Sequence, residues 1–164
     1  MAVDSLSRKR IRVYADTSVF GGCYDDEFSV DSRKLFDEIV EGKFLLVISE
    51  TTLLELGDAP PRVREVLTQL PLDSLEMIEI SEEILALRDA YLDAEVLGGS
   101  SIRDATHVAA GSVADVDMIV SWNFKHIVHF DKIHGFHAVN LLKGYRMVEI
   151  YSPKEVVRHE EETL

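Results

Sequence analysis

The sequence has little of what marks a disulfide scaffold or a membrane protein. Its 164 residues include a single cysteine, Cys23. A lone cysteine cannot form an intramolecular disulfide or a thiolate metal cluster, which agrees with a reducing compartment. The longest uninterrupted aliphatic and aromatic run, residues 44–48, is far shorter than the roughly 20 residues that a membrane-spanning helix requires. We therefore expect a cytoplasmic protein without membrane contact. No repeat or proline-rich linker divides the chain, so we expect a single domain, 1–164, with a core over about 11–153 and short flexible tails.

Basic residues are also scarce. The chain has 17 Lys and Arg against 30 Asp and Glu, which gives a formal net charge of −13. Because duplex binding depends mainly on Lys and Arg contacts with phosphates, this charge argues against a protein that coats nucleic acid. It does not exclude an enzyme that cuts nucleic acid, because carboxylates that hold Mg²⁺ add negative charge to the total. The question becomes whether some of the acids lie where a metal site would need them.

Short apolar segments alternate with helical patterns along the chain. Predicted strands cover residues 11–15, 43–48, 75–80, 118–122 and 146–151. Predicted helices cover about 32–41, 50–57, a short stretch after 60–61, a longer stretch from 82 to before 98, and 102–113. Candidate helix caps are Asp31, Ser49, Ser81 and a capping box over 101–104. This alternation predicts an α/β sandwich around a largely parallel sheet.

Four polar residues follow predicted strands or open the next helix. Asp16 closes the first strand, Asn123 follows the fourth, and Glu55 and Asp104 lie on helices that begin just after a strand or loop. In sheets of this class, sites form outside the carboxyl ends of the strands. Each acid also has a structural interpretation. Asp16 could cap a helix, Glu55 could be a solvated residue, and Asp104 could complement the helix dipole or complete the capping box.

The helix over 102–113 is predicted to have one buried and one polar face. Helical spacing places Ile102, Ala105, Ala109 and Val113 on the buried side. Asp104, His107 and Gly111 share the opposite face. Thr17 and Ser18, next to Asp16, add hydroxyls that could hold a metal-bound water or a phosphate, or could simply cap a helix.

Four segments of the sequence, RVYADTSVFGG, VISETTLLEL, SIRDATHVAAG and ADVDMIVSWNFKHIV, resemble in order and spacing the successive blocks of a PIN domain. This is the nuclease domain of VapC-type toxins, and the resemblance covers roughly residues 12–153. It implies a three-layer α/β/α sandwich with a central, mainly parallel sheet of four to five strands. It also implies three or four acidic residues that hold Mg²⁺ or Mn²⁺ for the cleavage of RNA phosphodiester bonds.

The resemblance assigns the catalytic and metal-binding residues. They are Asp16, Glu55, Asp104 and Asn123, with Ser18 and Lys125 as substrate-binding residues. Glu50 is the other candidate for the second acid, but the spacing to Leu56 favours Glu55. Where many members of the family have an Asp, this chain has Asn123. An amide oxygen can ligate Mg²⁺ but contributes no charge, so we expect one tightly held ion and leave open a second one assisted by Asp117.

The segment 118–148 runs against the acidic total. It contains Lys125, Lys132, Lys143 and Arg146 against a single acid, Asp131, so it could carry the phosphate backbone of a substrate or form a solvated surface. Four of the six histidines also lie here, but His126 and His129 are not joined by an acid or a cysteine in a usual zinc-ligand pattern. Trp122 could stack on a base or pack under the following loop.

Two other functions remain open from the sequence. An Asp after the first strand is similar to the nucleophile of haloacid-dehalogenase-like phosphatases, but those have a second Asp two residues later, where this chain has Ser18. Asn123, in place of the Asp of many family members, could also indicate a degenerate PIN domain that binds nucleic acid or protein without catalysis. The affinity for a metal ion would distinguish such a domain from an enzyme. The resemblance to toxins implies single-stranded or structured RNA as substrate, a small antitoxin as partner, and homodimerisation.

Overall fold

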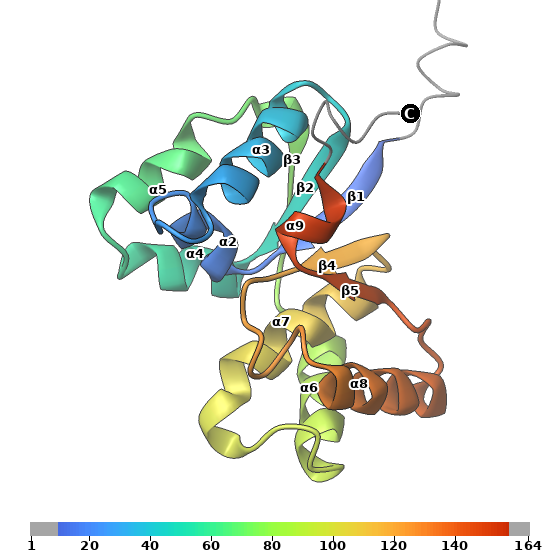
Figure 1. Cartoon of the computed structure of the whole chain (residues 1–164). Helices are drawn as coiled ribbons and strands as arrows, with labels where there is room; N and C mark the ends of the chain where they lie inside the picture. The colour runs from blue at the N-terminus through green and yellow to red at the C-terminus, as the bar shows by residue number, and fades with distance from the viewer. Residues whose placement is uncertain (1–9, 158–164) are drawn as a thin grey trace, which may run out of the picture.

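The computed structural model describes residues 10–157, which form a five-stranded sheet with helices on both faces (Figure 1). The strand order is β3-β2-β1-β4-β5, and every neighbouring pair is parallel. The strands are β1 (Ile11–Ala15), β2 (Phe44–Ser49), β3 (Leu75–Ile78), β4 (Met118–Val120) and β5 (Glu149–Tyr151). This architecture confirms the predicted α/β/α sandwich with a parallel sheet. The tails expected at the two ends lie outside the described residues.

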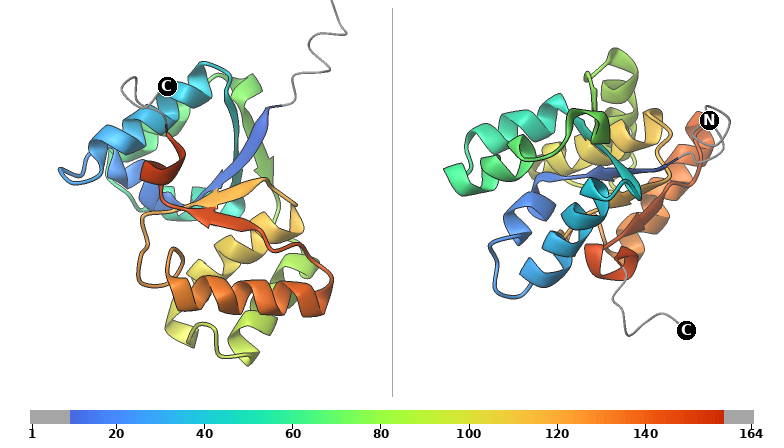
Figure 2. Two further views of the ribbon diagram at one scale, coloured as in Figure 1. Left: turned by 45° about the vertical axis from the view of Figure 1, so that its right-hand side comes forward. Right: turned by 90° about the horizontal axis from the view of Figure 1, so that it is seen from above.

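Helices cover the sheet on two sides (Figure 2). They are α2 (Thr17–Gly22), α3 (Ser29–Val40), α4 (Glu50–Gly57), α5 (Pro61–Thr68), α6 (Glu82–Asp93), α7 (Ile102–Val113), α8 (Phe130–Lys143) and α9 (Pro153–Val156), with short 3₁₀ turns at Leu72–Ser74 and Gly99–Ser101. Within residues 10–157, no helix is long and apolar enough to cross a membrane.

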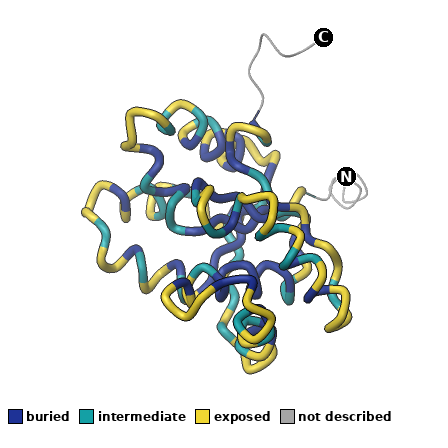
Figure 3. Tube along the Cα trace, turned by 60° about the horizontal axis from the view of Figure 1, so that its bottom comes forward, coloured by how far each residue is buried: buried dark blue, intermediate teal, exposed yellow. Residues whose placement is uncertain are grey.

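Two hydrophobic cores separate the three layers. Val13 and Ala15 of β1 pack with side chains of α2 and α3, whereas Tyr14 packs with side chains of α6, α7 and α8. Successive residues of a strand point to opposite faces, so a strand covered on both sides is apolar throughout, as in 44–48. Buried residues are consequently found mainly in the middle of the molecule, and exposed residues lie along the loops and outer helices (Figure 3).

The helices α8 and α9 lie where the sequence pattern predicts no helix, and two predicted helix caps are also wrong. α3 begins at Ser29, so Asp31 lies in its first turn and is not its cap. Ser101 is the N-cap of α7, but its side chain makes no capping hydrogen bond, so the predicted capping box is wrong. The carboxylate of Asp104 instead contacts His126. By contrast, Ser49 occupies the N-cap of α4, and the Ser81 hydroxyl accepts a hydrogen bond from the Ile84 amide at the start of α6.

The two-faced prediction for α7 is also wrong, because the helix lies between the sheet and α6. All residues from 105 to 112 are buried, including His107 and Gly111 on the face predicted to be polar. A helix packed on two sides needs small residues wherever a neighbour approaches closely, and Gly111 is such a position against β4. The polar residues on the face of α7 that was predicted to meet solvent therefore require hydrogen-bond partners inside the protein.

Gly111→Ala should destabilise the protein. An added Cβ would lie 2.7 Å from both Cδ1 and Cγ1 of Ile119. Helix propensity favours Ala over Gly by about 1 kcal/mol, but overpacking a core costs about 1–3 kcal/mol, so we expect the free energy of unfolding to fall by about 1 kcal/mol. Urea denaturation measures it. Gly57→Ala, where nothing lies within 4 Å of the added Cβ, is the control and should be neutral or stabilising. Equal behaviour of the two variants would contradict the packing argument.

Candidate metal and catalytic centre

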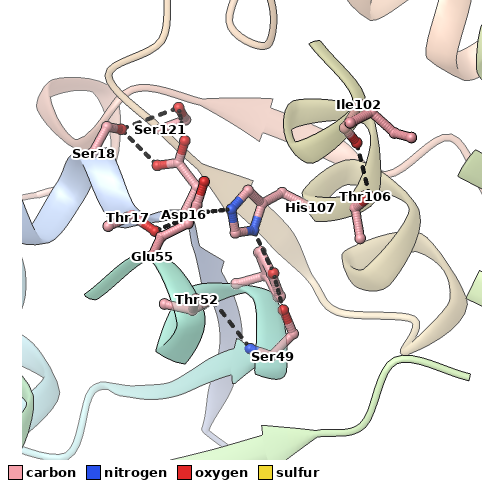
Figure 4. A network of polar contacts seen from close by, with 11 residues as sticks. Asp16, Thr17, Ser18, Ser49, Thr52, Glu55, Ile102, Thr106, His107 and Ser121 are labelled. Carbon is pink, nitrogen blue, oxygen red and sulfur yellow. Dashed lines mark hydrogen bonds and ion pairs between the residues drawn. The ribbon is translucent and has the colours of Figure 1, made fainter. Parts of the chain in front are cut away.

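Asp16 lies at the carboxyl edge of the sheet, where β1 and β4 end side by side. Its backbone amide donates to the carbonyl of Val120 at 3.3 Å, which aligns the ends of the two strands. Its side chain is almost fully buried, at 4% exposure. Ser18 Oγ donates to Asp16 Oδ1 at 2.6 Å, and Ser121 Oγ donates to Asp16 Oδ2 at 2.8 Å (Figure 4). The carboxylate is therefore held by one hydroxyl from α2 and one from the segment after β4.

The surroundings of Asp16 disfavour its negative charge. Burial raises the pKa of Asp16 above its ordinary value, and the charge of Asp104 adds to the rise. The positive charge of His107 and the hydrogen bonds from Ser18 and Ser121 act in the opposite direction without cancelling it. A further positive charge beside Asp16 would therefore favour its ionised form.

Glu55 is joined to the interior by a buried histidine. Glu55 Oε1 lies 2.6 Å from His107 Nε2 and accepts a second hydrogen bond from Thr17 Oγ1, also at 2.6 Å. On the other side of the imidazole, His107 Nδ1 lies 2.7 Å from the phenolic oxygen of Tyr14, which is 2.8 Å from Ser49 Oγ (Figure 4). This chain of contacts links α4, α7, β1 and the end of β2.

The acidic neighbours of His107 favour its positively charged form. Burial lowers its pKa, but the contact with Tyr14, the hydrogen bond to Glu55 and the charges of Asp16 and Glu55 together raise the pKa of His107 to about 10. Both ring nitrogens then donate, one to Glu55 and one to Tyr14. Burial raises the pKa of Glu55, but the hydrogen bond and charge of His107, with Thr17 and Arg103, outweigh it and leave that pKa below its ordinary value. The centre thus contains its own cation.

Asp104 and Asn123 are joined through His126. Asp104 Oδ2 lies 3.0 Å from His126 Nδ1. Asn123 Oδ1 accepts from the backbone amides of His126 at 2.9 Å and Lys125 at 3.2 Å, so its side chain closes the turn after β4. Lys125 itself is exposed on this turn. The turn therefore holds His126 against Asp104 at the border of the centre.

Comparison with known structures finds the same fold at low sequence identity. No family model matches the chain, and no curated protein matches it in sequence. It is similar to a chain of VapBC2 from Rickettsia felis, crystallised with a promoter DNA fragment, with a TM-score of 0.54, 12% identity and coverage of 87% of this chain and 98% of that one. FitAcB from Neisseria gonorrhoeae matches with a TM-score of 0.55 and 14% identity, over 88% of this chain and 99% of that one. A toxin–antitoxin complex from Klebsiella pneumoniae matches with a TM-score of 0.52 and 18% identity, over 70% of this chain and 88% of that one. The chain has a PIN-like fold.

In this PIN-like fold, the three predicted acids share the carboxyl edge of the sheet, whereas Asp117 lies at the opposite edge and Glu50 lies at the β3 end of the carboxyl edge. Asp117 Oδ2 accepts from the backbone amide of Arg12 at 2.7 Å, near the start of β1 and thus at the opposite edge from Asp16. It cannot assist Asn123 there. Glu50 Oε1 accepts from the Ile80 amide at 2.6 Å and so ties α4 to the segment after β3.

The expected basic surface over 118–148 does not form one continuous face. Arg146 donates to Asp115 Oδ1 at 2.7 Å and to the Val116 carbonyl at 2.8 Å, at the edge of the sheet that also holds Asp117. Lys132 Nζ donates to the carbonyl of Val96 at 2.9 Å. In this segment, Lys125 is the basic residue whose backbone amide contacts a predicted site residue, Asn123.

Sequence reasoning missed the histidines as members of the centre. His107 was placed on an outer face of α7, and His126 was considered only as a zinc ligand. The available signal was spacing, because His107 follows Asp104 by one helical turn and so lies on the same side of α7. Ser121, which donates to Asp16, likewise became visible only when β1 and β4 were seen to be neighbours.

The oxygen atoms of the predicted site residues are of the type that binds a hard divalent cation. Carboxylate and amide oxygens are the ligands that Mg²⁺ and Mn²⁺ prefer, and the buried Asp16 is stabilised by added positive charge. Across residues 10–157, however, no three acidic, histidine or cysteine side chains are arranged around one point for a metal. Glu55 and Asp104 each use one oxygen to contact a histidine. The acids are thus gathered at one edge but paired with imidazoles.

Proposed function

We propose that this protein is an endoribonuclease that hydrolyses RNA phosphodiester bonds with Mg²⁺ or Mn²⁺, and that it is the toxin of a toxin–antitoxin pair. The observation that carries the proposal is Asp16, a buried carboxylate held by two hydroxyls at the carboxyl edge of the sheet, with Glu55 and Asp104 beside it. The likeness of the fold to toxin–antitoxin proteins supports the same proposal.

The proposed roles follow from these contacts. Asp16, Glu55 and Asp104 would hold the ion, and Asn123 would complete the set through its amide oxygen by giving up the longer of its two hydrogen bonds, from the Lys125 amide. A divalent ion in such a site polarises the scissile phosphate and lowers the pKa of a bound water. Ser18, with Ser121, fixes the direction of the Asp16 carboxylate, and His107 fixes Glu55. Ser18 and the exposed Lys125 are the proposed contacts with the RNA backbone.

Metal removal tests the proposal. Purified protein incubated with single-stranded RNA should cleave it in Mg²⁺ or Mn²⁺, lose cleavage in excess EDTA and recover it when the ion is restored. The ion should also raise the melting temperature, because a ligand that binds only the folded state stabilises it by about 2.7 kcal/mol at 100 times its dissociation constant. Undiminished cleavage in EDTA would refute metal dependence.

A degenerate PIN-like domain that binds without cutting is the alternative. Two observations favour it: Asn123 stands where the resemblance expects an acid, and histidines already contact Glu55 and Asp104. Calorimetry with Mn²⁺ separates the two functions. Submillimolar binding that Asp16→Asn abolishes would support the enzyme, and no measurable heat would support the binding module.

The proposed partners follow from the toxin assignment and the charge. With a net charge of −13, the protein is suited to a small, basic antitoxin segment, and we propose a homodimer in the cytoplasm. The single-domain organisation over 1–164 remains a prediction. Light scattering of the purified protein measures the oligomeric state directly.

A further inference from the structure

A hollow of about 240 Å³ with an aromatic wall lies beside the proposed centre. We define this aromatic hollow by Phe28, Trp122 and Phe124 on its wall and by Glu27, Asp31 and Lys154 at its rim. Drug-sized ligands occupy roughly 300–1,000 Å³, so this volume suits a smaller group such as one planar ring system.

The aromatic wall is already assembled. The rings of Phe28 and Trp122 stack at 4.1 Å between centroids and 13° between planes. Trp122 Nε1 donates to Ser32 Oγ at 2.7 Å, and the tryptophan is buried. Phe124 is tilted against both rings and keeps 47% of its surface exposed. A ligand ring would therefore meet a fixed platform with one partly exposed phenyl ring, at little cost in ordering.

The hollow and the proposed centre share the chain segment 121–123. The backbone amide of Trp122 donates to Ser18 Oγ at 2.9 Å, and Ser18 donates to Asp16. Ser121 and Asn123, on either side of Trp122, contact Asp16 and close the turn that carries Lys125. A nucleic-acid strand with its phosphate at Asp16 would thus have its neighbouring base within reach of the hollow.

The charge at the rim distinguishes a base from a phosphate. Two carboxylates and one ammonium, from Glu27, Asp31 and Lys154, give the rim a net negative charge, which repels phosphate. Carboxylates accept hydrogen bonds from the N–H groups of bases, and lysine donates to base carbonyls. On its Watson–Crick edge, guanine has three N–H bonds and one carbonyl, whereas uracil has one N–H bond and two carbonyls, so a rim with more carboxylate than ammonium favours guanine. Base stacking on aromatic side chains is the usual way in which proteins hold unpaired nucleotides.

We propose that the aromatic hollow binds one unpaired base of the RNA, preferentially guanine, next to the phosphate that is cleaved. This inference rests on the proposed ribonuclease function and gives its substrate a local sequence preference. Phe124 supplies the stacking surface and Glu27 the hydrogen-bond acceptor for the base edge.

Binding without cleavage tests the hollow separately from catalysis. In EDTA, fluorescence anisotropy compares a labelled oligouridine with the same oligomer carrying one central guanine. The wild-type protein should bind the guanine oligomer about tenfold more tightly, and Phe124→Ala should weaken that binding about tenfold. Phe124→Tyr should restore it, and Glu27→Gln should reduce the preference for guanine. Phe130→Ala, which removes another exposed phenylalanine from the start of α8, is the matched control and should change nothing.

The outcomes separate this inference from the proposed function. Metal-dependent cleavage together with equal binding by the wild type and Phe124→Ala would overturn the hollow and leave the ribonuclease standing. Failure of the wild type both to bind and to cleave RNA would overturn both. Loss of binding to a basic peptide, with RNA binding unchanged in Phe124→Ala, would assign the hollow to a protein partner and also overturn the inference. Circular dichroism and the urea midpoint of each variant show that it is folded.

Discussion

Asp16→Asn should lower RNA cleavage by about 100-fold or more while the protein stays folded. Loss of a positioned catalytic carboxylate typically costs about 10²–10⁴ in rate, and the amide removes the charge that the proposed ion requires. The measurement is the initial rate of cleavage of a labelled single-stranded RNA in saturating Mn²⁺. Asp93→Asn, an exposed acid at the end of α6, is the control and should keep full activity.

The same substitution should leave stability unchanged or increase it. The folded-state pKa of Asp16 is raised, so its ionised form costs stability at pH 7, and a neutral amide removes that cost. The hydroxyls of Ser18 and Ser121 can rotate to accept from the new amide group. Urea denaturation in EDTA measures the change. Full cleavage activity of a folded Asp16→Asn protein would refute the proposed centre, and unfolding of the variant would refute this account of Asp16.

His107→Leu should destabilise the protein by about 1–3 kcal/mol in urea denaturation without metal, because it leaves the half-buried carboxylate of Glu55 without its charged partner. His107 is 1% exposed and the side chain of Glu55 is 22% exposed, so water can solvate only part of that carboxylate. The matched control is the double variant Glu55→Gln/His107→Leu, in which the remaining partner is neutral. It should recover at least about 1 kcal/mol of the loss, and purely additive losses would contradict the pairing.

The cost of His107→Leu should also depend on pH. The folded-state pKa of about 10 lies above the unfolded value of 6.5, so the imidazolium contributes stability fully below about pH 6.5 and loses it as pH rises through about 10. The difference in unfolding free energy between wild type and variant, measured in EDTA, should therefore shrink from pH 7 to pH 10. A constant difference would mean that His107 acts through packing alone.

Local patterns in the sequence predict much of the fold. Each strand of the sheet overlaps a predicted strand, and β2 extends one residue beyond its prediction, to Ser49. The central strand β2 is the clearest case, because residues buried on both faces are apolar. Asp16 is directly readable, since it ends the first strand and sheets of this class place their sites at that edge. The helix caps are less reliable. Ser49 and Ser81 hold as predicted, whereas Asp31 and the capping box at Ser101 do not, because caps compete with tertiary partners such as His126.

The sequence by itself determined the parallel α/β sandwich and the presence of acids after its strands, since both depend on hydrophobic periodicity and on order along the chain. Only the tertiary structure decided which side chains neutralise those acids. Helical periodicity assumes that one face meets water, but α7 packs between the sheet and α6, so His107 is enclosed and becomes the cation of the centre. Likewise, the basic residues of 118–148 are close in sequence, yet Arg146 lies at the opposite edge of the sheet from Asp16. A charge acts on the groups that it contacts in space, so closeness in sequence does not by itself make a basic surface.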